Sequence, residues 1–194
     1  MIIRKQFKFE MAHIVRKAWS QRCSRSVHGH SYLLEMFLSD ECGELDDAQM
    51  VVDFGAVKVL FNDLIDSFDH SLCFWKLPED QKIIDFSIEN FERVIVTPFN
   101  PSAEMQADFF LKAFNKILEV NKVQQLVDLN GAKAPLVKSV RIHETTTGWA
   151  EADLFALNKG TAFNDLSQSI YFSPAIQKDW KYPELLKEIL NIEG

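Results

Sequence analysis

The chain has 194 residues, with 21 Lys and Arg against 28 Asp and Glu, a net charge of −7 and 47% hydrophobic residues. That length predicts one domain, and the acidic charge argues against a general binder of nucleic acid or anionic membranes. No run reaches the roughly 18 apolar residues of a membrane-spanning helix, and the first residues lack the apolar segment of a signal peptide. Three cysteines without CxxC spacing favour a reduced, cytoplasmic protein over a disulfide framework.

Two strands are predicted at the start of the chain, because apolar residues alternate there with polar ones. The first strand runs from Ile3 to His13 and the second from His28 to Leu38. His13 ends the buried face of the first strand, whereas His28 and His30 begin the corresponding face of the second. The loop between them, residues 14–27, is long enough to be functional.

Two helices are predicted downstream of these strands. Asp53 is a suitable N-cap for the first helix, in which apolar residues recur at three- and four-residue steps up to Phe68. The tripeptide Asn100-Pro101-Ser102 predicts the start of the second helix, since proline is tolerated in a first turn.

The remaining pattern completes an α+β domain. Further strands are expected at 137–144 and around Trp149, and a short helix at 183–190. The predicted organisation is a core over residues 1–152, with an insertion at about 71–99, and an extension of the same domain over 153–194.

The tripeptide His28-Gly29-His30 predicts a metal site. Residues i and i+2 of a strand project from one face about 6.5–7 Å apart, so two imidazoles can converge on one ion. His13 can supply a third nitrogen if the two strands pair as antiparallel neighbours. Three imidazoles leave an open position on Zn²⁺, which is the catalytic pattern, although nickel or copper would also suit imidazole. A chance pair of ordinary polar histidines is the alternative interpretation.

Cys23 lies in the loop before His28, which carries four basic residues and no acidic one. Nearby cations favour the thiolate, so Cys23 can be a base, a nucleophile or a fourth zinc ligand that closes the site. A small buried hydrophobe is the alternative. The basic cluster is either a solvated loop or a polyphosphate-binding site, and it consists of Arg16, Lys17, Arg22 and Arg25.

Two acidic residues complete the set of candidates. Asp69 can orient the adjacent His70 as a proton shuttle, provided that the end of a helix gives the two residues an irregular backbone. A polar pair without function is the alternative. Glu144 shares the inward strand register of Val140 and Ile142, so it needs either a ligand with N–H donors, such as a flat heterocycle, or a buried arginine.

These pieces together resemble one family, the 6-pyruvoyl-tetrahydropterin synthase / 6-carboxytetrahydropterin synthase group. Six matching stretches fall in the family's order across residues 7–152, which is about three quarters of the chain. Each motif alone is a weak signal, whereas six in the correct order are a strong one. The stretches are Phe7-Lys-Phe-Glu-Met-Ala-His13, Cys23-Ser-Arg-Ser-Val-His-Gly-His30-Ser-Tyr, Met50-Val-Val-Asp-Phe-Gly-Ala-Val-Lys58, Phe68-Asp-His-Ser-Leu72, Asn100-Pro-Ser-Ala-Glu104 and Val140-Arg-Ile-His-Glu-Thr145.

The resemblance implies the tunnelling fold, an antiparallel four-stranded sheet with two helices on one face. It also implies homo-oligomers, trimers or hexamers, whose active sites lie between subunits. Ser102 keeps the hydroxyl of the family's Pro-Thr motif, which implies a role in binding substrate. The other implied roles are zinc ligands for His13, His28 and His30, the proton-abstracting base for Cys23, an acid/base pair for Asp69 and His70, and the pterin anchor for Glu144.

The implied substrate is 7,8-dihydroneopterin triphosphate. Cleavage of its side chain yields 6-carboxy-5,6,7,8-tetrahydropterin, acetaldehyde and triphosphate, a step toward queuosine and other deazapurines. Triphosphate elimination instead yields 6-pyruvoyl-tetrahydropterin. We favour the first product, because the chain reads as a compact cytoplasmic protein, while the Cys23-to-His28 spacing lies between those of the two branches. The remaining alternatives are another zinc enzyme, such as an aldolase or hydrolase, and a non-enzymatic module with a closed zinc site.

Overall fold

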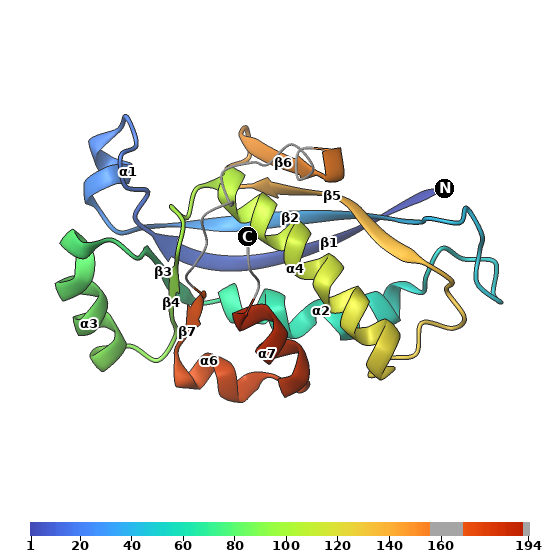
Figure 1. Ribbon diagram of the computed structural model, residues 1–194. Coiled ribbons are helices and arrows are strands. Elements are labelled where there is room, and N and C mark those ends of the chain that lie inside the picture. The colour runs from blue at the N-terminus through green and yellow to red at the C-terminus, as the bar shows by residue number, and fades with distance from the viewer. Residues whose placement is uncertain (156–168, 192–194) are drawn as a thin grey trace.

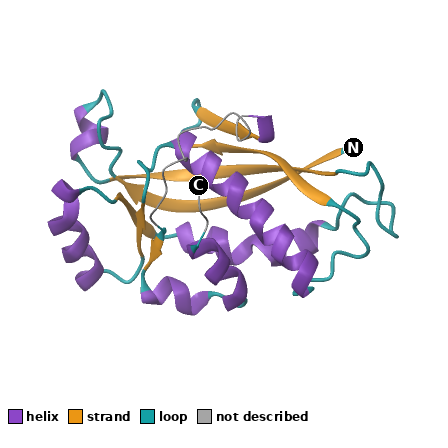
Figure 2. Cartoon of the chain, viewed as in Figure 1, coloured by secondary structure: helices purple, strands orange, loops and turns teal. Residues whose placement is uncertain are grey.

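The computed structural model describes residues 1–155 and 169–191, which form a mixed α+β structure around one sheet (Figures 1 and 2). The sheet has seven strands in the order β6-β5-β2-β1-β3-β4-β7. The strands are β1 (Ile2–His13), β2 (His28–Asp40), β3 (Ser71–Trp75), β4 (Val94–Thr97), β5 (Pro135–His143), β6 (Trp149–Asp153) and β7 (Tyr171–Phe172). The helices are α1 (Gln21–Arg25), α2 (Phe54–Phe68), the 3₁₀-helix η1 (Pro78–Asp80), α3 (Gln81–Asn90), α4 (Ala103–Gln124), α6 (Pro174–Asp179) and α7 (Pro183–Leu190).

The expected four-stranded antiparallel sheet is only one part of the observed sheet. Strands β6, β5, β2 and β1 pair antiparallel as expected. The 71–99 insertion then adds β3 and β4, which run parallel to β1, with α3 as the crossover that parallel pairing requires. Strand β7, from the C-terminal extension, pairs antiparallel with β4. The prediction was therefore wrong in the number of strands, because it gave no structure to the insertion.

The pairing of β1 with β2 brings the histidines together. Both strands form because of their two-residue alternation, as predicted, and their register places His13 opposite His28 and Met11 opposite His30. The even-numbered β1 residues face away from the core, since Phe7, Phe9 and Met11 are buried. The histidines therefore lie at the end of the strands, on the face that the helices cover.

Two long helices, α2 and α4, cover that face of the sheet (Figure 1). Asp53 caps α2, because its carboxylate accepts the backbone N–H groups of Gly55 and Ala56. Ser102 caps α4 in the same way, through the N–H of Met105. Both helix starts confirm the sequence signals, and the second cap holds Pro101 beside the histidines.

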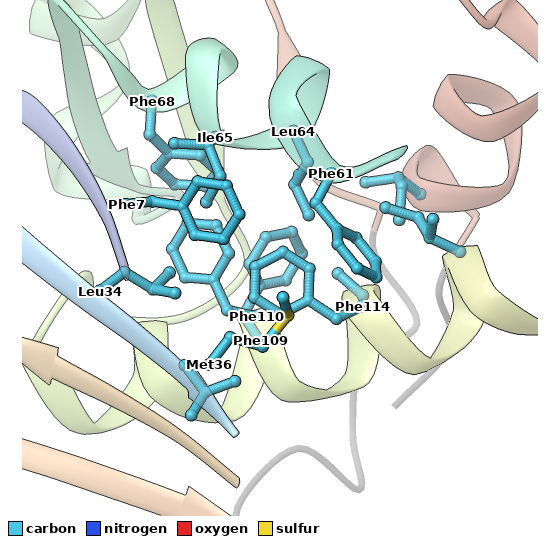
Figure 3. Close-up of a cluster of buried hydrophobic side chains, with 14 of the residues drawn as sticks. Phe7, Leu34, Met36, Phe61, Leu64, Ile65, Phe68, Phe109, Phe110 and Phe114 are labelled. Atoms are coloured by element: carbon cyan, nitrogen blue, oxygen red, sulfur yellow. The ribbon is translucent and has the colours of Figure 1, made fainter. Parts of the chain in front are cut away.

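The core between the sheet and the helices is rich in phenylalanine (Figure 3). Phe9 stacks on Tyr32 with ring centroids 4.9 Å apart, and Phe68 and Phe110 pack against each other at 4.8 Å. Each fully buried side chain of this size stabilises the fold by about 1.5–3 kcal/mol. This packing makes the strand ends a rigid support for the site.

The described part of the C-terminal extension packs into the same core. Ile176, Trp180 and Leu185 are buried there, and the Trp180 indole N–H donates to Ser67 Oγ over 2.8 Å. Helix α7 has the predicted bounds. Among the described helices, none combines the length and apolar character needed to cross a bilayer.

Candidate metal centre and active site

Three imidazole rings converge at the end of the β1–β2 pair. One ring nitrogen from each of His13, His28 and His30 lies within 4.8 Å of the other two. His13 is fully buried, whereas His28 and His30 are half-buried and open the cluster to solvent on one side. The expected convergence of three imidazoles on one point is therefore present in the fold.

Backbone carbonyls fix the orientation of two of these rings. His13 Nδ1 lies 2.8 Å from the Pro101 carbonyl oxygen, and His28 Nδ1 lies 3.0 Å from that of Ser26. Because a carbonyl can only accept, each Nδ1 must donate its proton, which leaves each Nε2 as a bare ligand atom. This arrangement of nitrogen donors fits a divalent metal such as zinc.

Burial favours the neutral form of two of the three imidazoles, His13 and His30. Desolvation lowers the pKa of His13 from 6.5 to about 4, and the neighbouring His28 and His30 act in the same direction against the Pro101 hydrogen bond. Burial also lowers the pKa of His30, although the Glu144 carboxylate opposes that shift. Neutral imidazole is the ligand form, so His13 needs no deprotonation at neutral pH.

Glu144 and Tyr32 lie beside the cluster. Glu144 comes one residue after the end of β5, and its Oε1 is 3.5 Å from His13 Nε2. Tyr32 donates to the same oxygen over 3.4 Å, and burial raises the pKa of Tyr32 so that the phenol keeps its proton. Among the described residues, Glu144 therefore contacts His13 and Tyr32 and not a buried arginine. The sequence interpretation missed Tyr32, although it follows His28 and His30 on the same strand face.

Cys23 lies on a short helix that is bonded to the chain just after β1. The predicted loop 14–27 contains α1, and the Val15 N–H donates to the Cys23 carbonyl over 3.0 Å, which ties α1 to the end of β1. The Cys23 side chain is half-buried. Of the other two cysteines, which the sequence predicts to be packing residues, Cys73 is buried, with a pKa that burial raises to about 12, whereas Cys42 is exposed.

The basic cluster divides into one paired residue and three exposed ones. Arg16 donates from Nε to Asp80 Oδ2 over 2.7 Å, reaches the other Asp80 oxygen, and also binds the Ser24 carbonyl at 2.7 Å. Its guanidinium is therefore bound to groups of the protein itself, and a direct contact of Arg16 with phosphate stays a prediction. Sequence spacing could not reveal this, because Asp80 belongs to the insertion. Lys17, Arg22 and Arg25 are exposed.

The Asp69–His70 pair forms at the end of α2. His70 has a left-handed backbone (φ 54°), and its Nδ1 lies 2.9 Å from Asp69 Oδ2. His70 lines a groove of about 790 Å³ whose other residues include Glu10, Ala12, Ser31 and His30. Glu10, Ala12 and Ser31 alternate along their strands with Met11, His13 and His30, so their side chains point to the opposite face of the sheet from the metal cluster. The predicted Asp69–His70 pair therefore forms within one chain, beside this groove.

Ser102 lies next to the metal cluster. Its hydroxyl accepts the Met105 N–H at 3.4 Å, and the preceding Pro101 carbonyl holds His13. Gln106 also donates to that carbonyl, over 3.0 Å. The segment before α4 therefore fixes the orientation of the His13 ring through the Pro101 carbonyl. This contact joins segments far apart in the sequence, so no local motif predicts it.

The chain is similar to proteins of known name. A family model described as 6-pyruvoyl tetrahydropterin synthase matches residues 2–154. Proteins named 6-carboxy-5,6,7,8-tetrahydropterin synthase from two strains of Helicobacter pylori are each 36% identical over 100% of this chain, and the match covers 93% of their length. A protein of the same name from Aquifex aeolicus is 30% identical over 60% of this chain and 80% of its own.

Solved structures share the fold. An uncharacterized protein of Wolinella succinogenes aligns with a TM-score of 0.62 and 21% identity, over 79% of this chain and 98% of its own. The 6-pyruvoyl tetrahydropterin synthase of Plasmodium vivax aligns with a TM-score of 0.52 and 12% identity, over 78% and 97%. With a family model that spans most of the sequence and relatives matched along its whole length, the chain belongs to the 6-pyruvoyl tetrahydropterin synthase family.

Proposed function

We propose that this protein is a 6-carboxy-5,6,7,8-tetrahydropterin synthase. It would convert 7,8-dihydroneopterin triphosphate to 6-carboxy-5,6,7,8-tetrahydropterin with release of acetaldehyde and triphosphate, in the cytoplasm, on the way to queuosine and related deazapurines. The observation that carries this proposal is the 36% identity to enzymes of that name along the entire chain. The convergent histidine cluster supports it, because the cluster provides a place for the metal that such chemistry uses.

We assign the metal as Zn²⁺, held by the Nε2 atoms of His13 and His28 and by a ring nitrogen of His30. When bound, zinc supplies Lewis-acid stabilisation of the negative charge that develops on a substrate oxygen. Tyr32 and Glu144 lie beside the cluster, where the carboxylate can accept two hydrogen bonds from the N–H edge of a pterin ring.

The other residues take the remaining tasks. Cys23, close to the end of β1, would remove the proton from the substrate carbon. The His70 Nε2, with Nδ1 held by Asp69, would deliver or collect the next proton. Ser102 would contact the pterin from the start of α4. The triphosphate would bind Lys17, Arg22 and Arg25, whereas Arg16 would act indirectly by holding their loop through Asp80.

We also propose that the active site is completed by a second copy of the chain. Within one chain the Asp69–His70 pair and the histidine cluster lie on opposite faces of the sheet. A homo-oligomer, a trimer or a hexamer, would bring the pair of one subunit to Cys23 of another.

The test is incubation with 7,8-dihydroneopterin triphosphate and measurement of both products. We expect acetaldehyde in amounts equal to the 6-carboxy product, and a Cys23→Ala variant that loses turnover while it keeps its zinc. Formation of 6-pyruvoyl-tetrahydropterin without acetaldehyde would assign the alternative reaction, which the name of the matching family model favours. Loss of zinc and of stability in Cys23→Ala would instead indicate a closed structural site in a non-enzymatic module.

A further inference from the structure

We propose that Arg93, in the 71–99 insertion, is a positioning residue that holds the Asp69–His70 pair in its working geometry. The inference rests on the proposed function for the meaning of that pair. The insertion (β3, η1, α3 and β4) and the extension (β7 and α6) lie next to each other beside the end of α2 (Figure 1). Both segments contact Arg93 or the residues next to it, so both help to position the Asp69–His70 pair.

The Arg93 guanidinium binds the end of α2 at several points. Its Nε donates to the Asp69 carbonyl over 2.9 Å, and one terminal nitrogen donates to the Asp66 carbonyl and to Asp66 Oδ2. The last carbonyls of a helix lack partners within the helix and carry partial negative charge. Arg93 donates to the Asp66 carbonyl, which also accepts the Asp69 N–H, and to the carbonyl of the C-cap residue Asp69 itself, so it fixes where the helix stops and where Asp69 lies.

This fixed end presents the pair in one arrangement. Asp69 Oδ1 accepts the Glu10 N–H over 2.7 Å, while Oδ2 binds His70 Nδ1. The His70 N–H donates to the Glu10 carbonyl over 2.6 Å, although His70 itself has a left-handed backbone. Such a conformation costs about 1 kcal/mol or more in a residue other than glycine and persists only where its surroundings hold it. Arg93 supplies part of that restraint.

Arg93 is itself held from two sides. Its carbonyl accepts the N–H of Leu72 in β3 over 3.0 Å. The flanking residues Glu92 and Val94 bind Ser173 of the extension, whose hydroxyl donates to the Glu92 carbonyl and accepts the Val94 N–H. The guanidinium also pairs with Asp179 of α6 at 2.8 Å. The side chain of Arg93 is only 20% exposed, so its orientation is fixed before any substrate binds.

The test compares Arg93→Ala and Arg93→Lys with wild type, and with Lys116→Ala as a matched control. Lys116 also pairs a basic side chain with the extension, through Glu188 at 3.6 Å, but it does not touch Asp69. In Arg93→Ala we expect kcat to fall by roughly 10- to 100-fold with little change in KM, because misplacement of a proton-transfer group by about 1 Å has costs of this size. Arg93→Lys should recover part of kcat, and Lys116→Ala should keep it.

A second readout does not depend on turnover. Nitrogen NMR of His70 should show the Nδ1–H form in wild type and Lys116→Ala, and a mixture of the two tautomers in Arg93→Ala. If Arg93→Ala fails to fold, Arg93→Lys and Asp179→Asn, which loosens the guanidinium from the other side, should show smaller shifts toward the mixture. An unchanged tautomer in folded Arg93 variants overturns the inference. Lack of turnover in wild type would overturn the proposed function but not this inference, because the His70 tautomer still shows whether Arg93 positions the pair.

Discussion

His13 is fully buried, yet it carries two ring nitrogens that both require partners. One partner is the Pro101 carbonyl at 2.8 Å, and the other nitrogen points into the cluster that His28 and His30 share. The Nε2 atom also lies 3.5 Å from the Tyr32 hydroxyl and from Glu144 Oε1, both at the long end of the hydrogen-bond range. A buried acceptor with only such long contacts is available to a ligand, and burial holds His13 neutral.

The metal assignment predicts that the loss of one histidine removes bound zinc, whereas the loss of another on the neighbouring strand does not. In His30→Ala, the bound zinc should fall from about one ion per chain to almost none, because only two imidazoles remain to hold it. Even the loss of a group that only orients a ligand lowers metal affinity by about 10- to 100-fold, so the loss of a ligand itself should lower it further. His143→Ala is the matched control, since His143 Nε2 binds Glu35 at 2.9 Å on the other face of the sheet. Elemental analysis and zinc titration measure both. Equal zinc in wild type and His30→Ala would contradict the assignment.

At the level of elements, the pattern of apolar residues predicted the strands and helices that depend on short stretches of sequence. The alternation in β1 and β2 gave the register that brings His13 to His28, and capping residues gave the starts of α2 and α4. Strands β3 and β4 were not predicted, because β4 is wholly buried and β3 largely so, and short runs of this kind do not alternate between apolar and polar residues. The pairing of Arg16 with Asp80 was not predicted either, because it joins a loop to an insertion that lies far along the chain.

Asp40 shows how one side chain can fix the register of two strands. It ends β2, where its Oδ2 accepts the Ala134 N–H over 2.7 Å and its Oδ1 accepts the Cys42 N–H over 2.8 Å. Ala134 immediately precedes β5, whose first residue, Pro135, pairs with Asp40. The backbone donors, the Ala134 N–H first among them, lower the pKa of Asp40 below its ordinary value of 3.8.

We therefore expect Asp40→Asn to destabilise the protein by about 1–3 kcal/mol at neutral pH, because an amide loses one of the two acceptor oxygens. Since the folded pKa lies below the unfolded one, the stabilisation is complete above 3.8 and is lost as the pH falls through the folded value. Urea unfolding at successively lower pH should show the two proteins converging. Exposed Asp85→Asn is the control, with a change of about 0.5 kcal/mol or less. A difference that stays constant with pH would contradict this account.

For the molecule as a whole, the sheet separates two groups of candidate residues, the histidine cluster and the Asp69–His70 pair. The histidine cluster lies on the face that α2 and α4 cover, and Cys23 is tied to the same strand end through Val15. His70, which pairs with Asp69, lines a groove together with Glu10, Ala12 and Ser31, whose side chains point to the opposite face. Motifs along the sequence name these candidate residues, but the face of the sheet that each one occupies follows from the strand pairing, which no single motif contains.

Co-expression of two inactive variants tests this arrangement. Cys23→Ala keeps His70, and His70→Ala keeps Cys23, so a mixed oligomer with sites between subunits contains some sites with both groups intact. Random mixing in equal amounts should restore about a quarter of wild-type turnover, since each site draws one half from each of two chains. A mixture of Cys23→Ala with His30→Ala is the matched control. Both of those residues come from the same half of the site, so that mixture should stay inactive. If the first mixture is also inactive while wild type turns over, each chain uses its own groups, and the site between subunits must be abandoned.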